Sequence, residues 1–120
     1  MTEKEFYEQI GGSYNEALGR LMRDSLIHKF LLKFPNDPSF AALKDAVAAQ
    51  DWDAAFSASH TLKGVALNLA LMKLGEAAVK LTDSLRAQNR DALTAENVVA
   101  LLADVETEYN AVLAGIAQLG

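Results

Sequence analysis

Apolar residues in this chain recur mainly at intervals of three and four, the spacing that places them on one face of an α-helix. Two stripes show this spacing most clearly: Leu74, Ala78, Leu81 and Leu85, and then Leu101, Val105, Tyr109, Val112 and Ile116. Both stripes are typical of helices that pack against a common core. We therefore predict that these segments belong to one helical domain.

Helix-breaking and helix-capping residues divide the first third of the chain. A short first helix is expected over residues 3–10, ending at Gly11-Gly12, because glycine readily adopts the left-handed conformation that ends helices. Ser13 and Glu16 have the spacing of a capping box, which predicts the start of a long second helix over residues 14–33. The stretch FPNDPS ends that helix.

The remaining helices follow from similar signals. Asp37 is expected to cap a third helix with Pro38 at its first position, running to about Gln50. Asp51 caps a fourth, a fifth covers residues 73–88, and QNRDALT reads as a polar loop. Thr94 caps a last helix that runs toward Leu119. The chain is predicted to be all-α: a single domain over residues 1–120, forming an antiparallel four-helix bundle with one or two additional short N-terminal helices.

Composition supports this class and excludes several functions. Alanine and leucine dominate, and there are two prolines and no cysteine in 120 residues, so no disulfide or thiolate metal site is possible. The net charge of −5 makes nucleic acid or an anionic membrane a poor partner. The charged N-terminus lacks the apolar segment of a signal peptide, and no apolar run approaches a membrane span. We expect a soluble, cytoplasmic protein, and Met1 favours a free-standing one.

The fourth helix contains one of the two histidines, His60. At about 100° per residue, an apolar face that includes Ala58, Leu62, Val65 and Leu69 points away from it. His60 should therefore face solvent. The residues predicted to share its side of the helix are Asp53, Phe56, Ser57, Lys63, Gly64 and Leu67.

This face has the chemistry of a phosphoryl acceptor. An exposed imidazole is a nucleophile near neutral pH, and Lys63, three residues on, can offset the charge of a phosphoryl group. Gly64 costs about 0.5–1 kcal/mol against alanine inside a helix, which suggests that something must approach the backbone there. Phe56, Ser57 and Leu67 would form a docking patch around it.

Plainer interpretations of the same residues stay open at this point. His60 and Lys63 could be surface side chains without a role. Gly64 could be a packing glycine at a helix crossing, and Phe56 could turn back into the bundle. The other histidine, His28, lies in LIHKFLLKF among apolar residues and is interpreted as structural or peripheral.

The stretch ASHTLKGVALNLA resembles the histidine-containing phosphotransfer (HPt) domain of two-component phosphorelays, and the close match covers residues 51–86. The resemblance implies that His60 accepts phosphate, that Lys63 stabilises it, and that Gly64 lets a receiver domain dock. A sensor histidine kinase and a response-regulator receiver domain would be the partners. The receiver would supply the aspartate and magnesium, so no metal or cofactor is expected in this chain.

Two positions depart from the family pattern. Ala70 stands where the family usually has the glycine that ends the histidine helix, so the helix could run on, or Asn68 or a later residue could end it. Thr82 stands where the family often has glutamate. These departures put the local turn and the choice of partner in doubt more than the chemistry.

Two alternative functions remain open beside a phosphocarrier. One is a non-catalytic bundle that binds receiver domains without transferring phosphate, and the other is the N-terminal phosphotransfer domain of a chemotaxis-type kinase. The chain contains no glycine-rich nucleotide-binding motif, which argues against kinase activity of its own. It also lacks the Glu-x-x-His pairs of di-metal helical enzymes.

Overall fold

The computed structural model describes residues 1–119 and contains no strand within them, so the all-α prediction is confirmed. Three short helices come first: α1 (Glu3–Ile10), α2 (Tyr14–Leu21) and α3 (Asp24–Lys33). The 3₁₀ turn η1 (Phe34–Asn36) leads into α4 (Ser39–Ala48), α5 (Trp52–Asn68) and α6 (Met72–Ser84). A second 3₁₀ segment, η2 (Ala87–Ala92), precedes the last helix, α7 (Ala95–Ile116).

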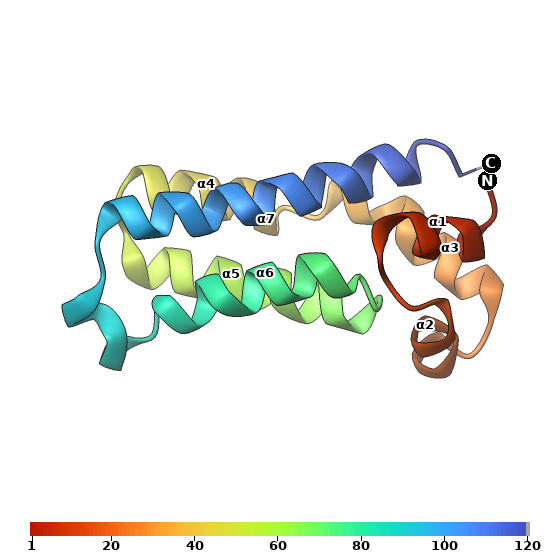
Figure 1. Ribbon diagram of the computed structural model, residues 1–120, viewed down its shortest axis with the longest axis horizontal. Helices are drawn as coiled ribbons and strands as arrows, with labels where there is room; N and C mark the ends of the chain where they lie inside the picture. The colour runs from red at the N-terminus through yellow and green to blue at the C-terminus, as the bar shows by residue number, and fades with distance from the viewer. Residues whose placement is uncertain (120) are drawn as a thin grey trace.

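Helices α4 to α7 lie side by side as an elongated bundle, and α1 to α3 gather at one end of it (Figure 1). Within the bundle α5 packs against both α4 and α6, while α7 packs against α6 and extends far enough to contact α1. The two ends of the described chain lie close together, and the Met1 amine donates a hydrogen bond to the Gln118 carbonyl at 3.3 Å. The predicted four-helix bundle is therefore present, with three short N-terminal helices rather than one or two.

The prediction of one continuous helix over residues 14–33 is wrong, because the chain breaks after Leu21. Met22 adopts a left-handed conformation with φ of +73°, and its N–H donates to the Leu18 carbonyl. The Tyr14 hydroxyl donates to Asp24 Oδ1 at 2.7 Å and so joins the starts of α2 and α3. No glycine or proline lies at this break. The apolar pattern alone therefore predicts one continuous helix.

Most of the expected helix caps are formed. Asp51 Oδ1 accepts from the Ala54 N–H at 3.1 Å, and Thr94 Oγ1 accepts from the Asn97 N–H at 3.1 Å. These two bonds satisfy N–H groups that have no partner inside the first turn of α5 and α7.

The N-terminal caps differ in detail from the prediction. Ser13 Oγ accepts from the Glu16 N–H at 3.1 Å, which is one half of the expected capping box. Both halves of a capping box are formed instead by Thr2 and Glu5 at the start of α1. Hydrogen bonds from the backbone and the side chain of Thr2 to the Glu5 carboxyl lower its pKa.

Two other boundaries differ from the sequence prediction. The N-cap of α4 is Pro38 and not Asp37, so Pro38 precedes the helix instead of opening it, although Asp37 Oδ1 accepts from the Ser39 N–H at 2.9 Å. Helix α6 ends at Ser84 rather than near residue 88. The segment predicted as a polar loop contains the 3₁₀ turns of η2.

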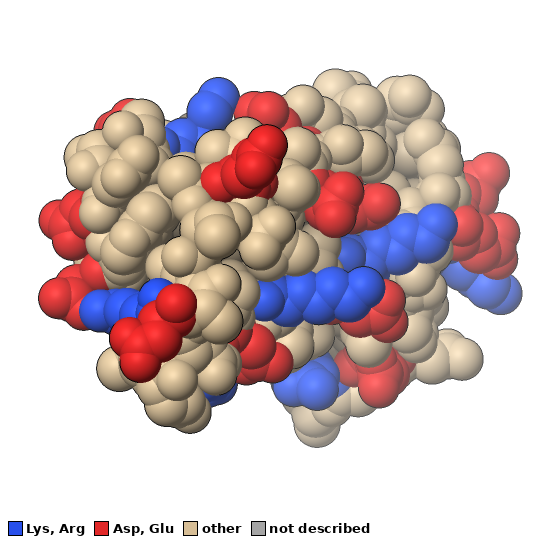
Figure 2. Space-filling model, turned by 60° about the vertical axis from the view of Figure 1, so that its left-hand side comes forward, with Lys and Arg blue, Asp and Glu red and all other residues tan. Residues whose placement is uncertain are grey.

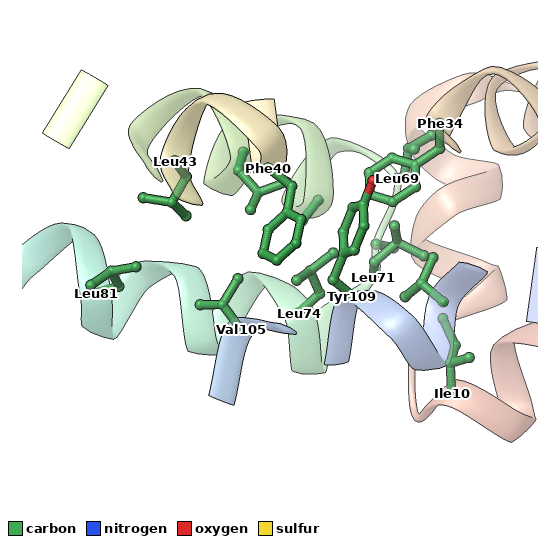
Figure 3. Close-up of a cluster of buried hydrophobic side chains, with 14 of the residues drawn as sticks. Ile10, Phe34, Phe40, Leu43, Leu69, Leu71, Leu74, Leu81, Val105 and Tyr109 are labelled. Carbon is green, nitrogen blue, oxygen red and sulfur yellow. The ribbon is translucent and has the colours of Figure 1, made fainter. Parts of the chain in front are cut away.

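Aromatic rings fill the core where the bundle meets the N-terminal helices (Figure 3). The rings of Phe40 and Tyr109 are stacked with centroids 4.2 Å apart, and Phe34 lies 5.6 Å from Tyr109. Burial raises the pKa of the Tyr109 hydroxyl. Of the two predicted apolar stripes, every member is buried except Leu101, which is half-buried.

Across residues 1–119, the structure contains no helix of the length and hydropathy required to cross a lipid bilayer.

Candidate functional site

Helix α5 is held in the middle of the bundle by its small and apolar residues. It buries Ala55, Ser59, Leu62 and Ala66, and these positions face α4 and α6. His60 lies on the opposite side of the helix and is exposed, as the apolar pattern predicts. The packing of one face of α5 therefore fixes the direction in which the imidazole points.

The His60 ring has no hydrogen bond or ion pair to any other part of residues 1–119. Its nearest aromatic neighbour is Phe56, one turn earlier, whose ring centroid lies 6.0 Å away at an interplanar angle of 39°. A ring nitrogen that is not engaged in the protein is available to a reacting group from outside.

Lys63 lies less than one turn beyond His60 on the same helix and is half-buried. No carboxylate in the described part of the chain lies within salt-bridge distance of its amine. Its positive charge is therefore not neutralised locally and can act on an anionic group attached to His60. The described residues contain no cluster of histidine, aspartate or glutamate side chains that could hold a metal ion.

Gly64 is exposed, and a Cβ atom built on it meets no other atom within 4 Å. The interpretation of Gly64 as a packing glycine at a helix crossing is therefore wrong. Gly75 and Gly115 show the contrast, because a Cβ there lies 2.5 Å from Leu67 Cδ2 and 2.7 Å from the Phe6 ring, respectively. The missing side chain at Gly64 leaves bare backbone on the outer surface beside His60.

The three other residues predicted to form a docking patch differ in exposure. Ser57 is exposed, and Phe56 and Leu67 are half-buried. Leu67 lies over Gly75 of α6, so part of its surface is used inside the bundle. Phe56 lies near His60 and is neither fully buried in the core nor fully exposed. A docking role for these three side chains remains a prediction.

Two arginines reach the same surface from the region after α6, and sequence reasoning missed both. The Arg90 guanidinium pairs with Asp53 near the start of α5, and its Nε donates to the Leu85 carbonyl at 3.0 Å. The Arg86 guanidinium lies 5.7 Å from the centre of the Phe56 ring. No local pattern signals these contacts, since they depend on how the end of α6 and η2 lie beside α5.

Thr82 is fully buried on the side of α6 that faces α5. Its hydroxyl lies 3.1 Å from Ser59 Oγ and 2.7 Å from the Ala78 carbonyl, while Ser59 Oγ donates to the Phe56 carbonyl. This departure from the family pattern therefore affects the α5–α6 contact directly behind His60 and not the exposed surface.

Ala70 ends the histidine helix in the way that glycine usually does. Its φ is +55°, its N–H donates to the Leu67 carbonyl, and the Leu71 N–H donates to the Ala66 carbonyl at 2.9 Å. These bonds form a Schellman motif, in which an alanine costs about 1–2 kcal/mol more than a glycine would. Helix α5 ends at Asn68 and does not run on.

The N-terminal helices satisfy the carbonyls at this end of α5. The buried Tyr7 hydroxyl donates to the Leu69 carbonyl at 2.7 Å, and the Ser13 N–H donates to the Ala70 carbonyl at 3.3 Å. Burial raises the pKa of the Tyr7 hydroxyl, so it stays protonated and able to donate. His28, the second histidine, forms an ion pair with Glu3 that joins α3 to α1 and is far from α5 in sequence.

The charges on the surface do not form a broad field of one sign on the face shown in Figure 2, where acidic and basic side chains are interspersed. The distinctive chemistry is local: an unengaged imidazole, an unpaired lysine and a stretch of bare backbone on one exposed helix face. Such a site can accept a group onto the imidazole from a donor that approaches from solvent.

Comparison with known proteins identifies the family of the chain. The family model for the Hpt domain matches residues 27–115, which is most of the chain and includes the whole of α5. No curated protein and no solved structure matched the chain. Hpt domains are phosphocarriers that interact with kinases and receiver domains in phosphorelays. The chain belongs to the Hpt domain family.

Proposed function

We propose that this protein is a histidine phosphotransfer protein of a two-component phosphorelay. It would carry a phosphoryl group on His60 between a kinase or receiver-domain aspartate and the aspartate of another receiver. The observation that carries the proposal is the exposed face of α5, where an unengaged His60 lies beside the unpaired Lys63 and the open backbone at Gly64.

The chemistry requires little from this chain beyond positioning and charge. The His60 nitrogen attacks the phosphorus of a receiver acyl phosphate, the P–O bond to the aspartate breaks, and the carboxylate leaves. Lys63 offsets the negative charge on the phosphoryl oxygens as it moves. The receiver supplies the aspartate and the magnesium, and because His60 is exposed, the receiver must also provide the enclosure that excludes water.

The accessible backbone at Gly64 gives the receiver a place to approach. Because a side chain there would project from the same face as His60, its absence lets a partner surface come close to the imidazole. Ser57, Phe56 and Leu67 would border that contact. We propose that the phosphate exchange takes place in the cytoplasm and that residues 1–120 act as a single domain.

A receiver-transfer time course tests the proposal. A receiver domain is phosphorylated with acetyl phosphate, freed of the donor, and mixed with wild-type protein, His60→Gln or His28→Gln. Wild-type protein and His28→Gln should lower the amount of phosphorylated receiver, while His60→Gln should not. Continued transfer to His60→Gln would overturn the assignment. The control is a receiver that exchanges phosphate with another Hpt domain. If that receiver binds this protein but exchanges no phosphate with it, the result would favour the non-catalytic binding module.

A further inference from the structure

Arg86 brings a cation from outside α5 onto the surface that surrounds His60. It lies just after the end of α6 and is 26 positions from the histidine in sequence. Its guanidinium carbon lies 5.7 Å from the centre of the Phe56 ring, and that ring lies 6.0 Å from the His60 ring. The guanidinium carbon is therefore no more than about 12 Å from the imidazole centre.

The way in which Arg86 is held leaves part of its guanidinium free. Its Nε donates to Asp83 Oδ1 at 3.1 Å, one turn earlier on α6. In the described part of the chain its two terminal nitrogens have no hydrogen-bond partner. The Phe56 ring supports the group from the α5 side, since a guanidinium is attracted to an aromatic face.

Arg90 provides a contrast in the same region. Its Nε donates to the Leu85 carbonyl and its Nη1 pairs with Asp53, so it is bound at both ends of the guanidinium. It offsets the charge of an acidic side chain on the His60 face. Of these two arginines, Arg86 is the one whose terminal N–H groups remain open to a new anion.

We propose that Arg86 contacts the phosphoryl group carried on His60 and, with Lys63, forms a two-sided cationic clamp around it. The inference rests on the proposed function, since it assigns a partner to the phosphoryl group of that site. A guanidinium matches phosphoryl oxygens with two parallel N–H bonds, which an ammonium cannot do. Arg86 reaches the group from α6 and Lys63 reaches it along α5, so the two cations approach from different elements.

The lifetime of phosphorylated His60 tests this contact without a receiver. Phosphoramidate, a small-molecule donor to histidine, loads wild-type protein, Arg86→Gln, Arg86→Lys and Arg90→Gln, and the donor is then removed. Hydrolysis follows, in which water adds to phosphorus, the N–P bond breaks and inorganic phosphate leaves. Arg86→Gln should shorten the half-life about three- to fivefold, the effect of losing one exposed ion pair, and Arg86→Lys should restore part of it.

Salt and the matched arginine separate this contact from general effects. At 1 M salt, where the Debye length is about 3 Å, the difference between wild-type and Arg86→Gln should become much smaller. Arg90→Gln should stay within about twofold of wild-type, since Arg90 is already engaged. An unchanged or longer half-life in folded Arg86→Gln overturns the clamp. If the half-lives of phosphorylated wild-type and Arg86→Gln differ as expected but no variant exchanges phosphate with a receiver, the relay function is overturned and the Arg86 contact stands.

Discussion

Replacing Gly64 by alanine should stabilise the free protein, although the residue belongs to the proposed site. Gly64 lies inside α5, is exposed, and offers an added Cβ open space to 4 Å in every direction. The substitution therefore changes only helix propensity and the entropy of the unfolded chain, which together favour alanine by about 0.5–1 kcal/mol. An unfolding entropy of about 2.1 cal/mol/K per residue converts this gain into a Tm rise of about 2–4 °C for 120 residues.

Gly115→Ala is the matched control for this measurement. Gly115 is also helical, but a Cβ there lies 2.7 Å from the ring of the fully buried Phe6. Forcing that ring aside should cost about 1–3 kcal/mol, which outweighs the propensity gain. Thermal unfolding followed by circular dichroism compares the two variants. A lower Tm for Gly64→Ala would refute the conclusion that the glycine has no packing role.

A larger side chain at the same position separates stability from function. Gly64→Gln should fold with a Tm at or above that of wild-type, since the side chain points into open space. Phosphate transfer from a receiver should nevertheless slow about tenfold or more, because the new side chain holds the partner away from His60. Transfer at the wild-type rate would show that receivers do not approach the backbone at this point.

Four further substitutions test the turns and the packing of the bundle. Gln50 is exposed with φ of +54°, so Gln50→Gly should raise the free energy of unfolding by about 1 kcal/mol, and a loss in urea denaturation would contradict this. Tyr7→Phe leaves the Leu69 carbonyl unpaired and should cost about 1–2 kcal/mol. Folding raises the pKa of Tyr7. The free energy of unfolding of the wild-type protein should therefore fall as pH rises above about 10, where the unfolded tyrosine loses its proton. An equally steep fall in Tyr7→Phe would show that Tyr7 does not cause this pH dependence. Thr82→Val and Ser59→Ala should each lower the free energy of unfolding by about 1 kcal/mol, and the double variant should lose less than the sum. Additive losses would mean that the two hydroxyls are not coupled.

The sequence predicts those parts of the site that depend on one helix. The direction of His60 follows from the apolar face of α5, and the start of α5 follows from Asp51, because both are set by residues within a few positions. The family resemblance covers the same segment and adds the expected roles of Lys63 and Gly64. Periodicity and capping are local physics, so a single sequence is enough to read them.

Contacts between helices are not readable in this way. The approach of Arg86 to Phe56 depends on how the end of α6 packs beside α5. The pairing of Arg90 with Asp53 depends on the path of η2, which the sequence presents as an ordinary polar loop. The break at Met22 depends on a left-handed residue that lacks the usual glycine. In each case the deciding interaction joins residues whose sequence spacing carries no signal.

The N-terminal helices show how a segment outside the family match can support the site. The Hpt match begins at residue 27, yet Tyr7 and Ser13 satisfy the carbonyls of Leu69 and Ala70 at the end of α5. The end of the histidine helix is thus completed by residues that precede the matched domain.

Mapping the phosphorylated residue tests the central claim most directly. The protein is incubated with a phosphorylated receiver domain, digested under alkaline conditions that preserve phosphohistidine, and analysed by mass spectrometry. The account predicts phosphate on His60 and none on His28, which is held in its ion pair with Glu3. Phosphate on His28 or on another residue, or an unlabelled protein beside a receiver that labels a second Hpt domain, would contradict it.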